Sequence, residues 1–313
     1  MKVLIFKSDR IGDLLNISSI LKNLNDMGHD IDLVCSSYNS QVAKYYNFIK
    51  KIYIRENLPL FVFKNFKIIF NKYDIIYQFD GSNWSFYLAT ILSSKRKYCL
   101  RYLKPKSFLN FKYFSSRPNK FLSFFFKYIQ CLEDYKIKDN KKYHYLKMYN
   151  KIMSLSGVEN KNLNHYLPKI DYNFNKKINL FNNYTYIHLD EKWLNYDQKY
   201  FILFKDKIFQ LSEQENFIIT ANKKNLFLDK FVNKKKNILA IYNSSINEIL
   251  FLINNAAQVV SFHSGFHVHA AACLNIKYID ILPIEKFNEM DRWIPVNLDY
   301  KRYEFNQIKD IKF

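Results

Sequence analysis

The chain has 313 residues, 49% of them hydrophobic, and a formal net charge of +20. This length and apolar content suffice for more than one core, so we expect two domains of about 150 residues each. No apolar run approaches the roughly 18 residues of a membrane-spanning helix, and the run at 3–6 is too short for a signal peptide. The sequence therefore predicts a cytoplasmic protein.

The cysteines and the positive charge narrow the class further. The four cysteines are widely separated and form no C-x-x-C pair, which argues against a disulfide framework and a structural zinc site. An anionic membrane surface or a phosphorylated ligand would explain the charge. The codon bias of an AT-rich genome would explain the charge equally well, because Lys, Asn, Ile, Phe and Tyr are abundant and glycines number only 5. We do not expect nucleic acid as a partner.

The first half of the chain alternates short apolar runs with amphipathic segments. A strand at 2–6 leads through a charged loop into a helical pattern that ends at Gly28. Further strands are expected at 31–35, 51–54 and 74–79, and further helices at 40–46, 60–71 and 83–93. Parallel strands need such crossover connections, so this half is predicted to be Rossmann-like.

The middle of the chain is less regular. Aromatic residues and lysines alternate without a clean period at 104–155, although a helix is expected at 143–155 before Gly157. The segment 104–127 mixes Lys, Arg and many Phe, which is typical of a segment that lies on an anionic bilayer. The alternative is an aromatic core helix with solvated lysines.

A second α/β series follows a connection rich in Asn and Lys. Strands are expected at 184–188, 217–220, 238–242, 258–262 and 278–282, and helices at 197–211, 226–232, 246–252 and 267–274. The domains are therefore predicted to span 1–168 and 169–313. In doubly wound sheets ligands bind beyond the carboxyl ends of the strands, which favours three loops as site candidates.

The first candidate loop runs from Lys7 to Asp13. It leads through Gly12 to a carboxylate at a helix start, which is free to accept a proton from a substrate hydroxyl. The structural alternative is that Asp13 caps the helix and complements its dipole. A single glycine is far short of a dinucleotide-binding fingerprint.

The second candidate loop, at 188–193, directly follows the first strand of the second half. Lys192 is placed to neutralise a diphosphate, and Trp193 to anchor the loop or to stack on a ring. The alternative is an exposed, salt-bridged loop with one buried tryptophan.

The third candidate loop, at 261–269, feeds a helix that continues with three alanines. Ser264 and Gly265 would expose unpaired N–H groups at a helix N-terminus, which is a ready anion site. Histidines at 263, 267 and 269 also suggest a metal. Against a metal, no Cys, Asp or Glu lies among them, and the Ser-Gly turn interrupts the helical spacing.

In these loops the sequence resembles glycosyltransferase family 9, the heptosyltransferase-like family of lipopolysaccharide assembly. V-L-I-F-K-S-D-R-I-G-D-L-L at 3–15 is similar to the family's opening strand, Gly-Asp loop and helix. Y-H-Y-L at 143–146 with M-S-L-S-G-V at 153–158 looks like its helix before the linker, and Lys192-Trp193 matches its Lys-Trp. Ser264-Gly265, His269 and the alanines are similar to its Asp-Ser-Gly-Pro-x-His-x-Ala-Ala signature.

The resemblance implies a GT-B fold, in which two Rossmann-like domains with parallel sheets face each other across a cleft. Asp13 would be the catalytic base of an inverting, metal-independent transfer, and Lys192 would stabilise the leaving diphosphate. The implied donor site comprises His188, Lys192, Trp193, His263, Ser264, Gly265, His267 and His269. The implied acceptor site comprises Lys7, Arg10 and Gly12.

The resemblance also implies substrates and a location. The donor would be ADP-heptose or another nucleotide-sugar, and the acceptor a lipopolysaccharide core or another surface glycan or glycolipid. No cofactor or metal would be needed, and the protein would be cytoplasmic or peripheral on the inner face of the cytoplasmic membrane.

Two departures from the family pattern bear on the donor. His263 replaces the acidic residue before Ser-Gly, and one extra residue leaves either His267 or His269 in the family's His position. The Gly-rich turn after the second strand of this domain is replaced by T-A-N-K at 220–223. The alternative to an enzyme is a noncatalytic binding protein, either a degenerate GT-B scaffold or a basic polyanion-binding protein.

Overall fold

The chain forms two compact units, Met1–Leu163 and Asn164–Phe313. The sequence analysis places the boundary slightly later, after Pro168. The computed structural model describes residues 1–108, 111–134, 144–160, 162–168, 172, 174–175, 179–189, 193, 195–221, 226–231 and 234–313. Each unit is described by itself.

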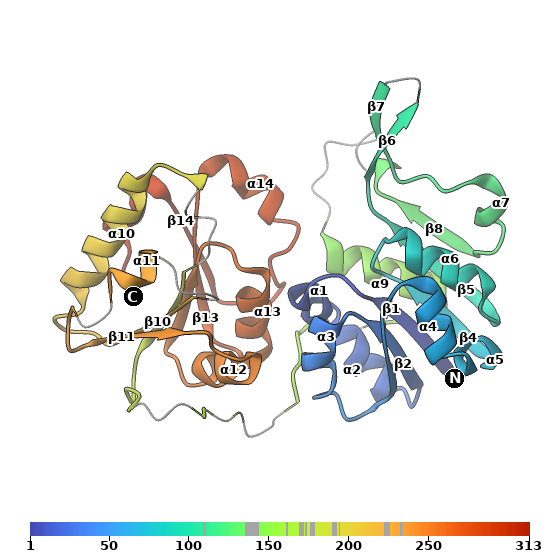
Figure 1. The fold of residues 1–313 in the computed structure, drawn as a ribbon, viewed down its shortest axis with the longest axis horizontal. Coiled ribbons are helices and arrows are strands. Elements are labelled where there is room, and N and C mark those ends of the chain that lie inside the picture. The colour runs from blue at the N-terminus through green and yellow to red at the C-terminus, as the bar shows by residue number, and fades with distance from the viewer. Residues whose placement is uncertain are drawn as a thin grey trace. The chain divides into compact units, whose positions relative to one another are not determined.

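Unit 1 is built on a six-stranded sheet in the order β3-β2-β1-β4-β5-β8, with parallel pairing throughout (Figure 1). Its strands are β1 (Lys2–Lys7), β2 (Asp30–Cys35), β3 (Ile49–Ile54), β4 (Tyr73–Gln78), β5 (Ser94–Arg101) and β8 (Tyr128–Cys131). The chain builds outward from β1 to β3 and then returns to β4 on the other side of β1. The topological switch point, where ligands bind in such sheets, therefore lies between the carboxyl ends of β1 and β4.

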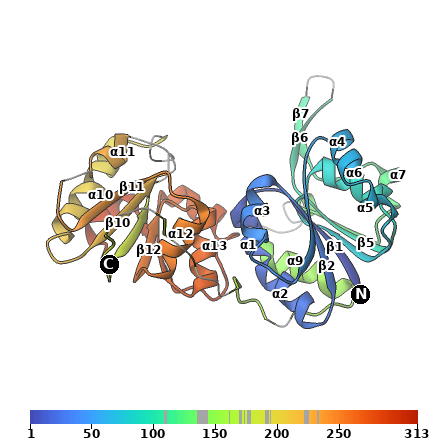
Figure 2. The same ribbon diagram turned by 60° about the horizontal axis from the view of Figure 1, so that its bottom comes forward.

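The helices of unit 1 cover both faces of this sheet. They are α1 (Ile11–Asn16), α2 (Ser18–Asp26), α3 (Ser37–Ala43), α4 (Leu58–Lys64), α5 (Lys67–Phe70), α6 (Asn83–Ile91), α7 (Lys120–Ser123) and α9 (Tyr145–Leu155). α4, α5, α6 and α7 lie together on one face, and α2 and α9 lie on the other (Figure 2). Ser36, Asn57 and Ser82 cap α3, α4 and α6 through their side-chain oxygens.

Two expected helices are each divided in the structure. The helical pattern after the first loop forms α1 and α2, which are separated at Ile17. The segment 60–71 forms α4 and α5, because Asn65 ends α4 and its side-chain amide donates to the carbonyl of Phe61. Asparagine competes with the backbone in this way and disfavours helix continuation.

β5 and a two-stranded antiparallel hairpin are additions to the predicted pattern. β5 has the sequence S-K-R-K-Y-C-L-R, in which Lys97 is buried and donates to the carbonyl of Thr90 at 2.8 Å. The hairpin pairs β6 (Lys104–Phe108) with β7 (Phe111–Ser115) and projects from unit 1 (Figures 1 and 2).

Unit 2 repeats the plan with the order β11-β10-β9-β12-β13-β14, again parallel. Its strands are β9 (Thr185–His188), β10 (Phe217–Ala221), β11 (Ile238–Tyr242), β12 (Gln258–Ser261), β13 (Lys277–Leu282) and β14 (Tyr300–Glu304). Its helices are α10 (Gln198–Leu211), α11 (Leu226–Asp229), α12 (Ile246–Asn254), α13 (Gly265–Leu274), α14 (Phe287–Met290), η2 (Ile284–Lys286) and η3 (Phe305–Asp310). The switch point lies between β9 and β12.

The predicted fold class of two Rossmann-like halves with parallel sheets is confirmed. The expected strands of the second half are all present, and β14 is added at the sheet edge. In the described part of the chain, no helix combines the length and apolar character that crossing a bilayer requires.

Candidate functional site

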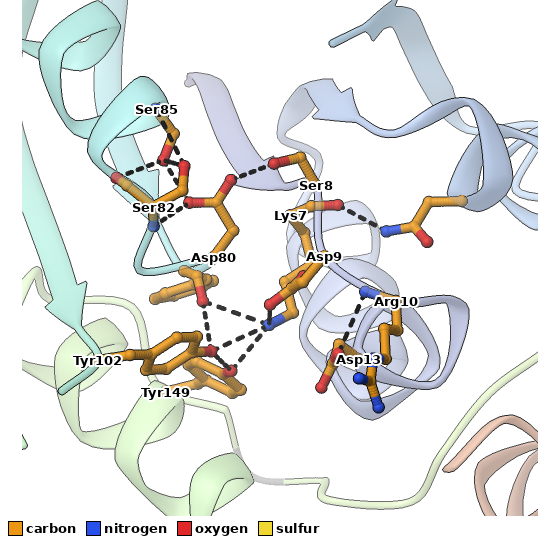
Figure 3. Close-up of polar contacts among 12 residues, drawn as sticks. Lys7, Ser8, Asp9, Arg10, Asp13, Asp80, Ser82, Ser85, Tyr102 and Tyr149 are labelled. Carbon is orange, nitrogen blue, oxygen red and sulfur yellow. Dashed lines mark hydrogen bonds and ion pairs between the residues drawn. The ribbon is translucent and has the colours of Figure 1, made fainter. Parts of the chain in front are cut away.

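Lys7 lies at the centre of a polar cluster at the switch point of unit 1. It is fully buried, and its ammonium nitrogen lies 3.0 Å from Asp9 Oδ2, 2.9 Å from the Tyr149 hydroxyl, 3.2 Å from the Phe79 carbonyl and 3.3 Å from the Tyr102 hydroxyl (Figure 3). An ammonium has only three protons to donate, so its capacity is used within the protein. The ammonium of Lys7, a residue that the resemblance implies for the acceptor site, is therefore held by contacts within the protein.

The ionisation of Asp9 is set by this surrounding. Burial raises the pKa of Asp9 to about 7, against the lowering effect of the Lys7 ammonium, and the carboxylates of Asp13 and Asp80 add to the rise. Burial disfavours the charged form of Lys7, but the Asp9 carboxylate holds the pKa of Lys7 above its ordinary value. The loop after β1 thus carries a carboxylate that titrates near neutral pH.

Asp80, which follows β4, ties the loop after β1 to α6. One of its carboxylate oxygens accepts hydrogen bonds from the Gln78 amide at 2.7 Å, the Ser82 backbone N–H at 3.1 Å and the Ser85 hydroxyl. The other accepts a hydrogen bond from the Ser8 hydroxyl (Figure 3). Because both oxygens are engaged, Asp80 is a structural carboxylate.

Gly81 allows Tyr102 to pack against this turn. Its φ is +61°, a backbone conformation that residues other than glycine rarely adopt. A Cβ atom at this position would lie 2.5 Å from the Tyr102 ring. Glycine at this position therefore serves both the turn and the ring that borders Lys7.

Asp13 lies in the first turn of α1 and is partly buried. One of its carboxylate oxygens accepts the backbone N–H of Arg10 at 3.2 Å, so the capping contact considered from the sequence is present (Figure 3). Arg10 is exposed, and Gly12 is buried within α1. A carboxylate accepts several hydrogen bonds, so this contact is compatible with a second partner.

Three cations gather beside Asp80 at the same edge of the sheet. Arg55, after β3, donates to the Ser8 hydroxyl at 3.0 Å. Arg101, at the end of β5, is only 7% exposed, and within the described residues its Nε has no hydrogen-bond partner. Burial lowers the pKa of Lys104, and the charges of Arg101 and Arg55 lower it further. Asp80 alone does not balance this group, so an anionic ligand would be stabilised here.

At the switch point of unit 2, His188 and His267 stack with 4.0 Å between ring centroids. His188 Nδ1 is hydrogen-bonded to the Thr220 hydroxyl at 3.1 Å, and His267 Nε2 to the Tyr186 hydroxyl at 3.2 Å. His267 Nδ1 is in turn 2.6 Å from the Ser264 hydroxyl. His188 at the end of β9, Ser264 before α13 and His267 in α13, all named for one donor site by the resemblance, therefore lie in one polar cluster.

His269 lies in a different environment. Its Nδ1 is 3.1 Å from His165 Nε2, and the two rings stack with 5.0 Å between centroids. Of the two histidines that could take the family's position, His267 is therefore the one that joins His188 and Ser264. Among the residues that the structure describes, no three His, Cys, Asp or Glu side chains are arranged to hold a metal.

His263 is held at the start of α13 by Asp280, which is fully buried in β13. The backbone N–H of His263 donates to Asp280 Oδ1 at 2.7 Å, and its Nδ1 is 2.5 Å from Oδ2. Tyr300 donates to the same Oδ2 at 2.8 Å. His263 has a φ of +42°, a conformation that costs energy in a residue with a side chain and that these contacts maintain.

Ser264 is the N-cap residue of α13, and its own N–H donates to the Ser261 hydroxyl at 3.0 Å. Gly265 is exposed at the first helical position.

Of the two roles considered for Trp193, the structure shows anchoring: the side chain is 3% exposed and stacks on Phe204 and Phe305 in the core. Lys192 lies outside the described residues.

Comparison with solved structures agrees with this architecture. A glycosyl transferase family 9 protein from Veillonella parvula is similar with a TM-score of 0.74 and 12% identity, over 97% of this chain and 85% of that chain. The E. coli ADP-heptose lipopolysaccharide heptosyltransferase II has a TM-score of 0.71 and 13% identity, over 100% and 95%. The E. coli heptosyltransferase WaaC with ADP has a TM-score of 0.63 and 14% identity, over 100% of this chain and 94% of that chain.

These likenesses establish that the chain shares the fold of GT-B glycosyltransferases, as its motifs predicted. No family model matches the sequence, and a search of curated proteins finds no relative. A UDP-GlcNAc 2-epimerase from Methanocaldococcus jannaschii is also similar, with a TM-score of 0.53 and 13% identity over 99% of this chain and 90% of that one. The fold therefore hosts more than one reaction, and function has to be argued from the site.

Several residues of the two clusters were missed from the sequence. They are Asp9, Arg55, Asp80, Arg101, Tyr102, Tyr149 and Asp280. Asp80 lies two residues after the end of β4, and Arg101 is the last residue of β5. Both could have been predicted from the rule that ligands bind beyond strand ends. Tyr149 lies on a helix, and nothing local in the sequence indicates that it reaches Lys7.

Proposed function

We propose that the protein is a glycosyltransferase that moves a sugar from a nucleotide-sugar to a glycan or glycolipid acceptor. One observation carries the proposal: in each unit, the polar residues of the family-like motifs lie at the topological switch point of the sheet. Lys7 and Asp13 do so in unit 1, and His188, Ser264 and His267 in unit 2. The fold shared with heptosyltransferases supports it.

In this proposal unit 1 binds the acceptor, and Asp13 is the base. Asp13 takes the proton of an acceptor hydroxyl while that oxygen forms a bond to the anomeric carbon of the donor sugar. The bond from this carbon to the diphosphate oxygen breaks in the same step, its electron pair leaves with the diphosphate, and the configuration inverts. Arg55, Arg101 and Lys104 favour an acceptor that carries a phosphate or carboxylate.

Unit 2 binds the donor. The first amides of α13, together with Ser264 and Gly265, would hold the diphosphate, and Lys192 would neutralise the charge that develops on it. Cationic side chains and the helix terminus would supply this stabilisation without a metal ion. ADP-heptose is the first donor to test, because the similar WaaC structures contain ADP or an ADP-heptose analogue. The reaction would take place at the inner face of the cytoplasmic membrane.

Thermal unfolding with a panel of ADP, UDP, GDP and CMP forms tests the proposal. A ligand that binds the native state raises the melting temperature. We expect one nucleotide to stabilise the wild type and to lose this effect in Lys192→Ala. Asp13→Asn should keep the nucleotide shift and lose sugar transfer by at least about 100-fold, which is the low end of a general base's contribution.

Two results would contradict the assignment. If no nucleotide-sugar stabilises the wild type, unit 2 does not bind a donor, and a noncatalytic scaffold or a polyanion-binding protein is the better description. If Asp13→Asn retains full transfer activity, the base lies elsewhere in unit 1. Lys151→Gln, a change at an exposed lysine of α9, is the matched control and should alter neither readout.

A further inference from the structure

The exposed phenylalanines of the described residues are confined to one part of unit 1. Eight phenylalanine side chains are exposed, and all of them lie between positions 63 and 125. Phe124 is 88% exposed and Phe63 is 81% exposed. Six of them lie on or next to α4, α5 and α7, and we call these six the phenylalanine face: Phe63, Phe66, Phe70, Phe121, Phe124 and Phe125.

The helices that carry most of this face share one core beneath it. Phe61 of α4, Ile68 of α5 and Phe86 of α6 are buried in the same cluster, and Leu122 of α7 packs against it. Phe86 also stacks on Phe126, which follows α7, with 4.7 Å between centroids. Because their inner sides pack together, the outer sides of these helices form one surface (Figures 1 and 2).

Other exposed apolar side chains lie on neighbouring elements. On α6, Tyr87 and Ile91 are 48% and 58% exposed and add to the apolar area. On the projecting hairpin, Phe111 and Phe114 of β7 are also exposed, but they lie three residues apart and therefore point to opposite sides of the strand. Single exposed apolar residues are ordinary, whereas many of them on neighbouring helices are typical of an interaction surface.

The charge around the phenylalanine face identifies its partner. Nine lysines and arginines at 58–127 are exposed, and three of them pair with carboxylates: Lys64 with Glu56, Lys95 with Asp74 and Arg117 with Asp134. Within the described residues the other six form no ion pair; they are Lys67, Lys72, Lys106, Lys112, Lys120 and Lys127. Aromatic side chains interleaved with unbalanced cations match an anionic bilayer, in which rings enter the headgroup boundary and lysines meet lipid phosphates.

We propose that the phenylalanine face docks unit 1 onto an anionic lipid bilayer. Lysines and arginines near such a surface are attracted to its anionic headgroups, and the rings add the transfer of their apolar area out of water. A purely electrostatic contact would not need the phenylalanines, and a purely apolar one would not need the lysines. The proposal stands independently of sugar transfer, because it requires neither Asp13 nor a nucleotide.

Sedimentation with vesicles tests the proposal on the full chain without nucleotide. We expect binding to vesicles of phosphatidylcholine with 30% phosphatidylglycerol, about 10-fold weaker binding when salt rises from 0.05 to 0.5 M, and little binding to pure phosphatidylcholine. The double variant Phe63→Ser/Phe124→Ser should bind at least about 10-fold less, since two of the most exposed rings no longer leave water for the bilayer. Tyr38→Ser/Ile284→Ser, which removes exposed apolar side chains elsewhere, should bind like the wild type.

A second readout separates insertion from simple adsorption. In Phe124→Trp, vesicles with phosphatidylglycerol should shift the tryptophan emission to shorter wavelength relative to the wild type, and Lys120→Gln/Lys127→Gln should weaken binding and flatten its salt dependence. The proposal is overturned if the Phe63/Phe124 variant binds as well as the wild type. It is equally overturned if the wild type ignores anionic vesicles at low salt, or if these substitutions abolish self-association of the chain and leave lipid binding unchanged.

Discussion

Asp9 and Lys7 form an ion pair at the end of β1, with 3.0 Å between Oδ2 and Nζ, and Lys7 is fully buried. The carboxylates of Asp13 and Asp80 lie close enough to act on the same pair. Burial contributes most to the raised pKa of Asp9, which is about 7, and these two carboxylates add to the rise, while the Lys7 ammonium opposes it.

Stability should consequently depend on pH through Asp9. Its pKa is about 7 in the folded protein and about 4 in an unfolded chain, so the folded state binds the proton more tightly. This contribution is complete below pH 4 and is lost as the pH rises through 7. Melting temperatures at pH 5, 6, 7 and 8 should fall more steeply for the wild type than for Asp9→Asn. Asp30→Asn, at an exposed carboxylate, should keep the wild-type slope, and equal slopes for all three proteins would refute this origin.

Removal of the Tyr149 hydroxyl should destabilise unit 1. Tyr149→Phe takes away an acceptor 2.9 Å from a fully buried ammonium, and water cannot replace it without reorganising the cluster. Leaving a buried polar group less satisfied costs about 1–3 kcal/mol, more for a charged one. Urea unfolding measures this loss. Tyr38→Phe, at an exposed tyrosine, is the control and should change the free energy of unfolding by less than about 0.5 kcal/mol.

Gly81 and Gly28 provide a matched pair for the contact with Tyr102. Both have positive φ, +61° and +72°, but a Cβ at Gly81 would meet the Tyr102 ring at 2.5 Å, whereas a Cβ at Gly28 would meet nothing within 4 Å. Gly28→Ala should cost about 1–2 kcal/mol from backbone strain alone. Gly81→Ala should cost a further 1–3 kcal/mol or so from overpacking. Similar losses in thermal or urea unfolding would show that Tyr102 moves away freely.

Asp280 should matter more to unit 2 than any single one of its partners. Asp280→Asn replaces one carboxylate oxygen by an NH₂ group that faces donors, while Tyr300→Phe removes the hydrogen bond to Asp280 at 2.8 Å and the acceptor of the Arg302 Nε hydrogen bond at 3.1 Å. We expect losses of about 2–4 kcal/mol and about 1 kcal/mol respectively, measured by urea unfolding. If the nucleotide site adjoins His263, Asp280→Asn should also reduce the nucleotide-dependent rise in melting temperature. A larger loss in Tyr300→Phe than in Asp280→Asn would contradict this order.

The alternation of elements was predictable because parallel strands are buried on both faces and appear as apolar runs. The run at 3–6 and the strands of unit 2 have this signature, and the sheets follow from it. β5 lacks this apolar signature, because its first half is charged. Lys97 is nevertheless buried there and donates a hydrogen bond to the Thr90 carbonyl, a contact that no local pattern predicts. The edge strand β14, with the sequence Y-K-R-Y-E, is equally inconspicuous.

The candidate site was predictable where it is local and unpredictable where it is assembled from distant segments. The loops with Asp13, His188 and Ser264 follow predicted strands, so their place at the sheet edge could be inferred. Whether His267 or His269 meets His188 depends on the direction in which α13 leaves its cap, which only the packed structure fixes. The burial of Lys7 depends on Tyr102 and Tyr149, which lie far away in the chain, so it could not be inferred from the loop alone.

The contacts of Lys7 also constrain how unit 1 can fold. Its ammonium joins residues that are 72, 95 and 142 positions away along the chain. Closing loops of this length costs conformational entropy before the contacts can repay it, which makes such contacts late events in folding. An incomplete unit 1 that lacks α9 would hold a desolvated ammonium without its full set of acceptors. The β1 loop should therefore reach its final form only when the first and last segments of the unit have docked, so that a partly folded chain cannot present a finished site.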